Sequence, residues 1–185
     1  RQLANEFQLN LHMDGARFAN AVVASGVSPA DVTWRAGVDC LSFGLTKNGG
    51  IATEAVVMFN PALAEDFAYR RKRAGHLWSK QRFLAAQWLG LLENNLWLDN
   101  AGHANAMARE LGAGFAAHDA IRLPWPVDAN ELFPVIPEML RGQLREAGLA
   151  FYDWPQEAGM TRFVTNFGTD PAEVARALEV IAASQ

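Results

Sequence analysis

A strand, a helix and a second strand follow one another near the start of the chain, and this order limits the folds open to it. Residues 9–14 alternate apolar and polar side chains, as a strand with one buried face does, and Gly15 ends the run. Residues 16–25 have a helical pattern that Gly26 closes, and residues 38–43 form a second apolar strand. Strand, helix and strand in this order predict the parallel sheet of an α/β fold.

The rest of the chain alternates between helical and strand-like patterns. The further expected elements are a short proline-capped helix beginning at residues 28–29, a strand at 52–59, helices at 61–74 and 79–111 with a break near 93–95, strands at 129–136, 149–154 and 161–167, and helices at 137–147 and 171–183. We therefore divide the chain into a partial large domain (residues 1–76), connecting helices (77–118) and a small C-terminal α/β domain (119–185).

Composition excludes several classes of function. Of the 185 residues, 50% are hydrophobic and 19% charged, enough apolar material for a substantial core. The net charge of -4 offers no basic face for nucleic acid, and the longest basic run, residues 70–73, suits the C-terminal end of a helix. No apolar run reaches membrane-spanning length, and the single Cys40 suits a reducing compartment. We expect a soluble, cytoplasmic protein that binds neither membranes nor nucleic acid.

A lone lysine follows the second strand, at a place where the chain turns. The strand at residues 38–43 ends at Gly44, and Lys47 stands in the sequence LTKNGG, whose glycines permit unusual backbone angles. An isolated loop lysine is usually solvated. Asp14, however, ends the first strand, and in an open parallel sheet the carboxyl ends of the strands share the edge where ligands bind. We therefore expect Asp14 and Lys47 to face one site.

An amine and a carboxylate at one site have a specific chemical use. A lysine can form an imine with an aldehyde cofactor, and a carboxylate can keep a pyridine nitrogen protonated. A pyridoxal phosphate enzyme requires both, because the protonated ring accepts the electrons released when a bond at the substrate Cα breaks. Asp14 and Lys47 thus predict pyridoxal 5'-phosphate as the cofactor, and no metal site is predicted.

Longer stretches around both residues resemble a known family. Residues 11–21, LHMDGARFANA, and 39–50, DCLSFGLTKNGG, are similar to the cofactor-binding stretches of the L-threonine aldolases of the low-specificity type. These enzymes belong to the β-eliminating lyase group of pyridoxal phosphate enzymes, which has the aspartate aminotransferase-type fold. Two later stretches, RKRAGHLWSKQRFLAAQ and TRFVTNF, also resemble that family. The resemblance implies an α/β protein of fold type I, of which this chain holds the end of the large-domain sheet and a small C-terminal domain.

The resemblance also assigns roles to individual residues. It implies that Lys47 carries the cofactor and acts in catalysis, that Asp14 contacts the pyridinium nitrogen, and that Arg17 lies near the phenolic oxygen. Arg162, in the stretch MTRFV, is similar to the arginine that binds the substrate α-carboxylate, for which a planar guanidinium offers two parallel hydrogen bonds. Without the resemblance, Arg17 would suit a salt bridge at a helix start, and Arg162 the exposed face of an edge strand.

Other residues near the predicted site are weaker candidates. His12 shares a strand face with Asp14, but a histidine paired inside the sheet is the simpler interpretation. Thr46 could donate to the cofactor phosphate, although Gly44 stands where many relatives of the broader fold have a serine. The tryptophans have the spacing of buried or interface helix faces rather than of cofactor contacts: Trp78, Trp88 and Trp97.

The resemblance implies a retro-aldol cleavage of L-threonine and related β-hydroxy-α-amino acids to glycine and an aldehyde. A β-elimination or a transamination would use the same cofactor. A non-catalytic assembly module, in which Asp14 and Lys47 only neutralise each other, is a third hypothesis.

Family members assemble as homo-oligomers, so a homodimer or homotetramer is implied. The family's phosphate-binding glycine loop and ring-stacking histidine lie upstream of the region resembled, and residues 1–7 have the pattern of the end of a helix. We therefore expect the chain to be part of a longer protein.

Overall fold

The structure is a computed structural model that describes residues 1–184, and these form two compact units. The first unit is Arg1–Asp99, and the second begins at Asn100. The helix α5 (Leu96–Ala116) begins in the first unit and continues into the second. The three-part division expected from the sequence stays a prediction.

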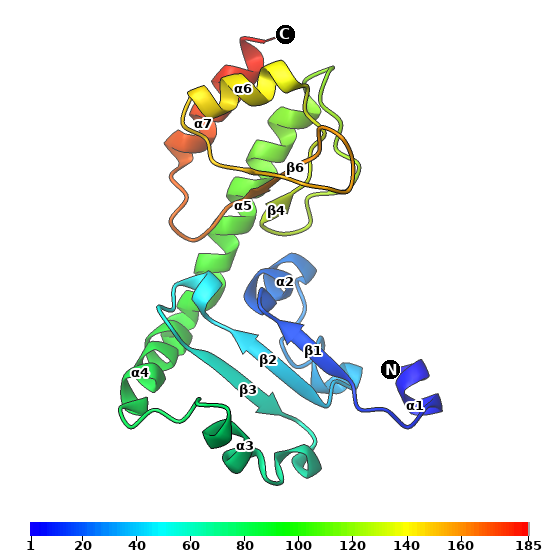
Figure 1. Ribbon diagram of the computed structural model, residues 1–185, viewed down its shortest axis with the longest axis vertical. Helices are drawn as coiled ribbons and strands as arrows, with labels where there is room; N and C mark the ends of the chain where they lie inside the picture. Colours follow the sequence, from blue (N-terminus) through cyan, green and yellow to red (C-terminus); the bar gives the residue numbers. More distant parts are fainter. Residues whose placement is uncertain (185) are drawn as a thin grey trace. The chain divides into compact units, whose positions relative to one another are not determined.

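Three strands lie side by side in the first unit, with β2 in the middle (Figure 1). They are β1 (His12–Gly15), β2 (Cys40–Gly44) and β3 (Glu54–Met58). β1 and β2 are parallel, as predicted, with Asp14 opposite Ser42. β3 runs antiparallel to β2, so the prediction of a parallel sheet is wrong for this strand. The connection between them is too short for the crossover that a parallel pair requires.

The helices of the first unit agree only in part with those predicted from the sequence. They are α1 (Gln2–Glu6), α2 (Phe18–Ser25), α3 (Phe67–Arg73) and α4 (Gln81–Leu92), with short 3-10 turns η1 (Trp34–Ala36), η2 (Thr46–Asn48), η3 (Pro61–Ala64) and η4 (Glu93–Asn95). Gly26 closes α2 in the left-handed conformation. Asn94, with φ of 53°, interrupts the helix between α4 and α5, where the sequence predicts a break.

Two helix predictions in this unit are wrong. The helix predicted from residues 28–29 is replaced by turns over residues 29–33. The helix predicted over 61–74 is divided into η3 and α3, because Asp66 adopts a left-handed φ of 58°. The sequence pattern does not reveal this change, since aspartate is compatible with both helix starts and left-handed turns.

Aromatic rings from α2, α4 and α5 pack against the middle strand. The ring of Phe43 in β2 lies 5.1 Å from that of Phe18, 4.7 Å from that of Trp88 and 5.5 Å from that of Trp97, each at an edge-to-face angle. Pairs of this kind contribute about 0.5–1.5 kcal/mol each beyond the burial of their area. Trp88 and Trp97 therefore serve packing, as predicted, whereas Trp78 is 49% exposed.

The second unit contains a small antiparallel sheet and two further helices. Its elements are β4 (Glu131–Leu132), β5 (Tyr152–Asp153), β6 (Thr161–Val164), α6 (Glu138–Glu146) and α7 (Pro171–Ala182), and the strand order is β4-β6-β5. Figure 1 shows α6 and α7 side by side. The buried core is Met107, Ala108, Leu111, Phe115, Ile121, Leu132, Ile136, Leu140, Leu144, Phe163, Val174, Ala177 and Ile181.

The strands of this unit are shorter than predicted. Pro134 has no N–H to donate to a ladder, and beyond it Val135 exchanges two backbone hydrogen bonds with Arg122 instead, at 2.8 and 3.2 Å. The helices fit better, because α7 begins with the predicted proline, and the carboxylate of Asp170 accepts from the N–H of Ala172 at 2.9 Å. None of the helices formed by residues 1–184 has both the length and the apolar character that a bilayer crossing requires.

Two residues of α6 that differ in burial provide a matched test of the core of the second unit. Leu144 is fully buried, whereas Met139 on the same helix is 73% exposed. We expect Leu144→Ala to lower the free energy of unfolding by about 2–5 kcal/mol, and Met139→Ala to change it by less than about 0.5 kcal/mol. Urea unfolding followed by circular dichroism measures both, and equal losses would contradict this core.

Candidate active site

Asp14 and Lys47 lie in the chain where two neighbouring parallel strands end. Asp14 is the penultimate residue of β1, and its Oδ1 accepts from the N–H of Ala16 at 3.0 Å. Lys47 is the middle residue of η2, immediately beyond β2. Both side chains are exposed. Because β1 and β2 are parallel and adjacent, the two residues lie at one edge of the sheet.

Two glycines let the turns at this edge approach each other closely. A Cβ on Gly44 would lie 2.8 Å from the Cα of Ala16 and 2.9 Å from its carbonyl oxygen. A Cβ on Gly15 would lie 2.6 Å from the carbonyl oxygen of Ser42. Any side chain at these positions would force the two strand ends apart. The serine that many relatives of the broader fold have at the position of Gly44 is therefore excluded here by packing.

The carboxylate of Glu54 holds the first part of the turn that carries Lys47. We call residues 45–50 the lysine turn. Glu54, at the start of β3, accepts from the N–H of Leu45 at 3.1 Å, from the N–H of Thr46 at 3.3 Å and from the Thr46 hydroxyl at 2.5 Å. The hydroxyl proton that Thr46 could offer to a phosphate is therefore directed at Glu54 in this structure. No sequence signal pointed to Glu54.

Buried contacts hold the remainder of the lysine turn. The side-chain amide of Asn48, only 5% exposed, donates to the carbonyl oxygen of Trp97 at 2.7 Å. The N–H groups of Asn48 and Gly50 both donate to the carbonyl oxygen of Leu45, which is fully buried. Gly49 has a φ of 110°, a conformation that favours glycine. Lys47 is thus an exposed side chain on a backbone fixed from both sides.

Arg17 and His12 belong to the same part of the first unit. Arg17 is half-buried and is the residue that precedes the first turn of α2. His12, two residues before Asp14 in β1, lies 2.8 Å from the hydroxyl of Ser42 through its Nε2. The interpretation of His12 as a histidine paired within the sheet agrees with this contact.

Arg162 belongs to the second unit and lies on its central strand, β6. Its Nε donates to the carboxylate of Glu131 at 2.8 Å, its Nη2 donates to the same oxygen, and the ring of Trp154 lies 5.5 Å from its Cζ. The side chain is 25% exposed. The alternative that placed this arginine on the exposed face of an edge strand is therefore wrong.

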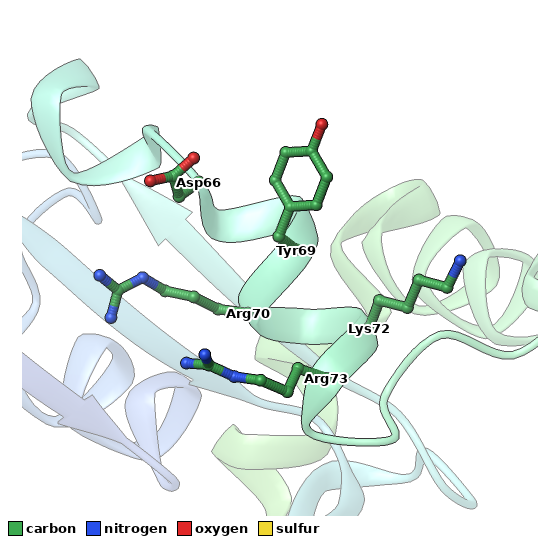
Figure 2. Close-up of a pocket in the computed structure, with 5 residues that line it drawn as sticks. All are labelled: Asp66, Tyr69, Arg70, Lys72 and Arg73. Carbon is green, nitrogen blue, oxygen red and sulfur yellow. The ribbon is translucent and has the colours of Figure 1, made fainter.

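A surface hollow on α3 is a second candidate site, but the directions of its side chains argue against a binding role. The hollow has a volume of about 540 Å³ and is lined by Asp66, Tyr69, Arg70, Lys72 and Arg73. Figure 2 shows Arg70 and Arg73 extending to one side of α3 and Lys72 to the other, so the cations do not converge on one point. They occupy the last turn of α3, where cations favour the helix dipole, as predicted.

A larger cavity, of about 770 Å³, lies against β3, α3 and α4. Thr46, Glu54 and Trp88 contribute to its wall, whereas Asp14 and Lys47 do not. Within residues 1–184, no three His, Cys, Asp or Glu side chains are grouped as they would be to hold a metal ion. The charged residues at the edge shared by β1 and β2 therefore remain the best candidate site.

Comparison with known proteins identifies the family. The family model described as beta-eliminating lyase matches residues 1–139. The chain belongs to the beta-eliminating lyase family. It is 48% identical over 169 residues to a low specificity L-threonine aldolase of Pseudomonas sp., a match that covers 91% of this chain and 49% of that protein. A low specificity L-threonine aldolase of Pseudomonas aeruginosa is 49% identical over 165 residues, covering 89% and 47%.

A solved structure confirms the fold expected of this beta-eliminating lyase chain. The threonine aldolase of Leishmania major superimposes with a TM-score of 0.89 and 32% identity, over 98% of this chain and 53% of that one. The resemblance to threonine aldolases and the predicted fold class, a mixed α/β part of a fold type I protein, are both confirmed. The chain spans about half the length of these relatives.

The contacts of Glu54 predict that it fixes the lysine turn. In Glu54→Ala three hydrogen bonds lose their acceptor, whereas Glu54→Gln keeps an oxygen in place. We expect Glu54→Ala to lower the free energy of unfolding by about 1–2 kcal/mol, and Glu54→Gln to lose less than half as much. Urea unfolding measures both, and hydrogen exchange at the N–H of Thr46 should accelerate in Glu54→Ala alone. Unchanged exchange there would contradict the assignment.

The contacts of Asp39 should make the stability of the fold depend on pH. Its Oδ2 accepts from the N–H of Leu11 at 2.8 Å and from Arg1 at 2.6 Å, and these contacts hold the pKa of Asp39 below its usual range. A lowered pKa in the folded state means that ionised Asp39 stabilises the fold above the unfolded pKa, about 3.9, and that this contribution is lost as the pH falls through the folded pKa.

We therefore expect Asp39→Asn to melt at a lower temperature than the wild type at pH 7, with the gap closing below about pH 4. Asparagine keeps an oxygen for the N–H of Leu11, so the variant isolates the effect of the charge. Melting temperatures from pH 7 to pH 2.5 check this. A gap of constant size across the range would show that the charge is not responsible.

Proposed function

We propose that the intact protein cleaves L-threonine and related β-hydroxy-α-amino acids to glycine and an aldehyde with pyridoxal 5'-phosphate. The observation that carries this proposal is the common edge of β1 and β2, where Asp14 stands at the end of β1 and Lys47 on the turn that follows β2. The 48% identity to a curated low specificity L-threonine aldolase supports the choice of substrate.

The side chains at this edge fit pyridoxal phosphate. The cofactor needs an accessible amine and, on the far side of its ring, a carboxylate with a fixed orientation. Lys47 is exposed on a fixed turn, and the N–H of Ala16 orients the carboxylate of Asp14. Within residues 1–184 no ion pair joins Asp14 to Lys47, so the two charges do not neutralise each other directly. This argues against the hypothesis of a non-catalytic module.

Each predicted site residue has a role that its chemistry permits. When bound, pyridoxal phosphate supplies an electron sink for the pair released at the substrate Cα. Lys47 would hold it through its ε-amine, and Asp14 would keep a proton on the ring nitrogen. Arg17 would favour the ionised phenolic oxygen. Arg162 would bind the substrate α-carboxylate through two parallel hydrogen bonds.

Cleavage moves two protons as one carbon–carbon bond breaks. The β-hydroxyl group gives its proton to a base while the Cα–Cβ bond breaks; the bonding pair stays with Cα, and the hydroxyl-bearing carbon leaves as the aldehyde. Cα then gains a proton and the product is glycine. Arg162 holds the carboxylate throughout, so the amino acid keeps one orientation during the reaction.

We infer a homodimer or homotetramer in the cytoplasm, which the family resemblance and the single Cys40 support.

A β-elimination is the second candidate reaction, since the matching family is described as beta-eliminating lyase. Only aldol cleavage yields glycine and a free aldehyde in equal amounts, so analysis of the products separates it from elimination and from transamination.

Lys47 provides the direct test of the proposal. We expect the intact protein to absorb visible light after addition of pyridoxal phosphate, and to release acetaldehyde and glycine from L-threonine. Lys47→Ala should abolish both. Lys72→Ala is the matched control, because Lys72 is an exposed lysine on α3 that extends away from Arg70 and Arg73 (Figure 2).

Borohydride reduction followed by peptide mass spectrometry locates the attachment point. The mass of the reduced cofactor should appear on the peptide that contains Lys47. Full activity in Lys47→Ala, or an adduct on a different lysine, would refute the assignment. An adduct on Lys47 without glycine formation would leave the cofactor in place and refute the aldol cleavage.

A further inference from the structure

We propose that Glu131 is a positioning residue that orients Arg162 for the substrate carboxylate. The inference rests on the proposed function, because it specifies how the second unit would recognise the amino acid. Glu131 contributes no group to the reaction, and its proposed effect on the substrate passes through the guanidinium of Arg162.

The sheet brings the two side chains to one face. Thr161 and Phe163, the neighbours of Arg162 in β6, are buried, so Arg162 faces away from the core. Glu131 of β4 stands opposite Val164, two residues from Arg162. Diagonal partners on one face of an antiparallel pair lie within reach of long side chains. The pairing of β4 with β6 therefore sets which carboxylate meets Arg162.

The contacts fix the guanidinium in two ways. One oxygen of Glu131 accepts from both Nε and Nη2, which sets the rotation of the guanidinium group about its long axis. The ring of Trp154 lies 5.5 Å from Cζ and limits the tilt of the guanidinium plane. Glu131 and Arg162 are each 25% exposed, so the pair is partly shielded from water.

This arrangement leaves a second edge of the guanidinium, adjacent to the first, for a ligand. Glu131 occupies the edge formed by Nε and Nη2. Within the described residues of the second unit, Nη1 of Arg162 has no hydrogen-bond partner. A carboxylate on the edge formed by Nη1 and Nη2 would receive two parallel hydrogen bonds. Arg162 would then lose little rotamer freedom on binding, since Glu131 has already restricted it.

The charge of Glu131 and its position should have opposite effects on substrate binding. A negative carboxylate near Arg162 weakens the attraction of the arginine for a second carboxylate. If Glu131 serves position, removing its oxygens should weaken substrate binding, whereas removing only its charge should not. Glu131→Ala and Glu131→Gln separate the two effects, because glutamine keeps an oxygen to accept from Nε and Nη2.

Steady-state kinetics of the intact holoenzyme with L-threonine provide the first test. We expect Glu131→Ala to raise KM roughly tenfold, as for a lost hydrogen bond to a charged group, with kcat within about twofold. Glu131→Gln should have a KM equal to or below that of the wild type. Glu157→Ala is the control, because Glu157 pairs with Arg122 elsewhere in the same unit and should leave KM unchanged.

Three kinetic results would overturn the proposal. They are an unchanged or lowered KM in Glu131→Ala, a fall in kcat without a rise in KM, and an equal rise of KM in both Glu131 variants. If the wild type does not cleave threonine at all, the proposed function fails, and the position of Arg162 is judged by spectroscopy alone.

The spectroscopic test needs neither cofactor nor substrate. The Nε–H group of Arg162 should give a protected proton–nitrogen correlation signal, assigned by its absence in Arg162→Lys. We expect the signal to persist in Glu131→Gln and to exchange with water at least about tenfold faster in Glu131→Ala. Equal protection in Glu131→Ala and the wild type would show that Glu131 does not hold Arg162, and would overturn the inference whatever the activity.

Discussion

The close approach of two strand ends is the constraint on which the candidate site depends. Gly15 and Gly44 have no side chains where the turn after β1 meets the end of β2, and any Cβ there would lie within 3 Å of the opposing backbone. Parallel pairing alone brings the carboxyl ends of two strands to one edge. The two glycines additionally let their turns pack directly, so that an acid and an amine distant in sequence share that edge.

The lysine turn illustrates how the fold fixes a reactive side chain without burying it. Glu54 accepts from its first N–H groups, and the buried amide of Asn48 ties its end to the chain at Trp97. Trp97 also contacts the ring of Phe43 in β2, so the strand and the turn that follows it have a common support. A lysine on such a backbone can hold a cofactor in one orientation, as catalysis by positioning requires.

Local signals allowed part of this structure to be predicted from sequence, and long-range contacts account for the rest. Gly26 and Asn94 end helices through their own backbone conformations, so their positions were predicted correctly. The direction of β3 depends on the length of a connection, and the apolar pattern of a strand is the same in either direction. The partners of the site residues were not predictable from the sequence. In the sequence, Glu54 and Glu131 are simply acids in strands, and only the register of the sheets shows which residues they meet.

The central claim is that Asp14 and Lys47 bind opposite ends of one pyridoxal phosphate ring. A crystal structure of the intact protein with the cofactor tests it most directly. The account predicts a covalent bond from Nζ of Lys47 to the cofactor, with the carboxylate of Asp14 within hydrogen-bond distance, about 2.6–3.2 Å, of the pyridine nitrogen. A cofactor held by another lysine, or an Asp14 carboxylate directed away from the ring, would contradict it.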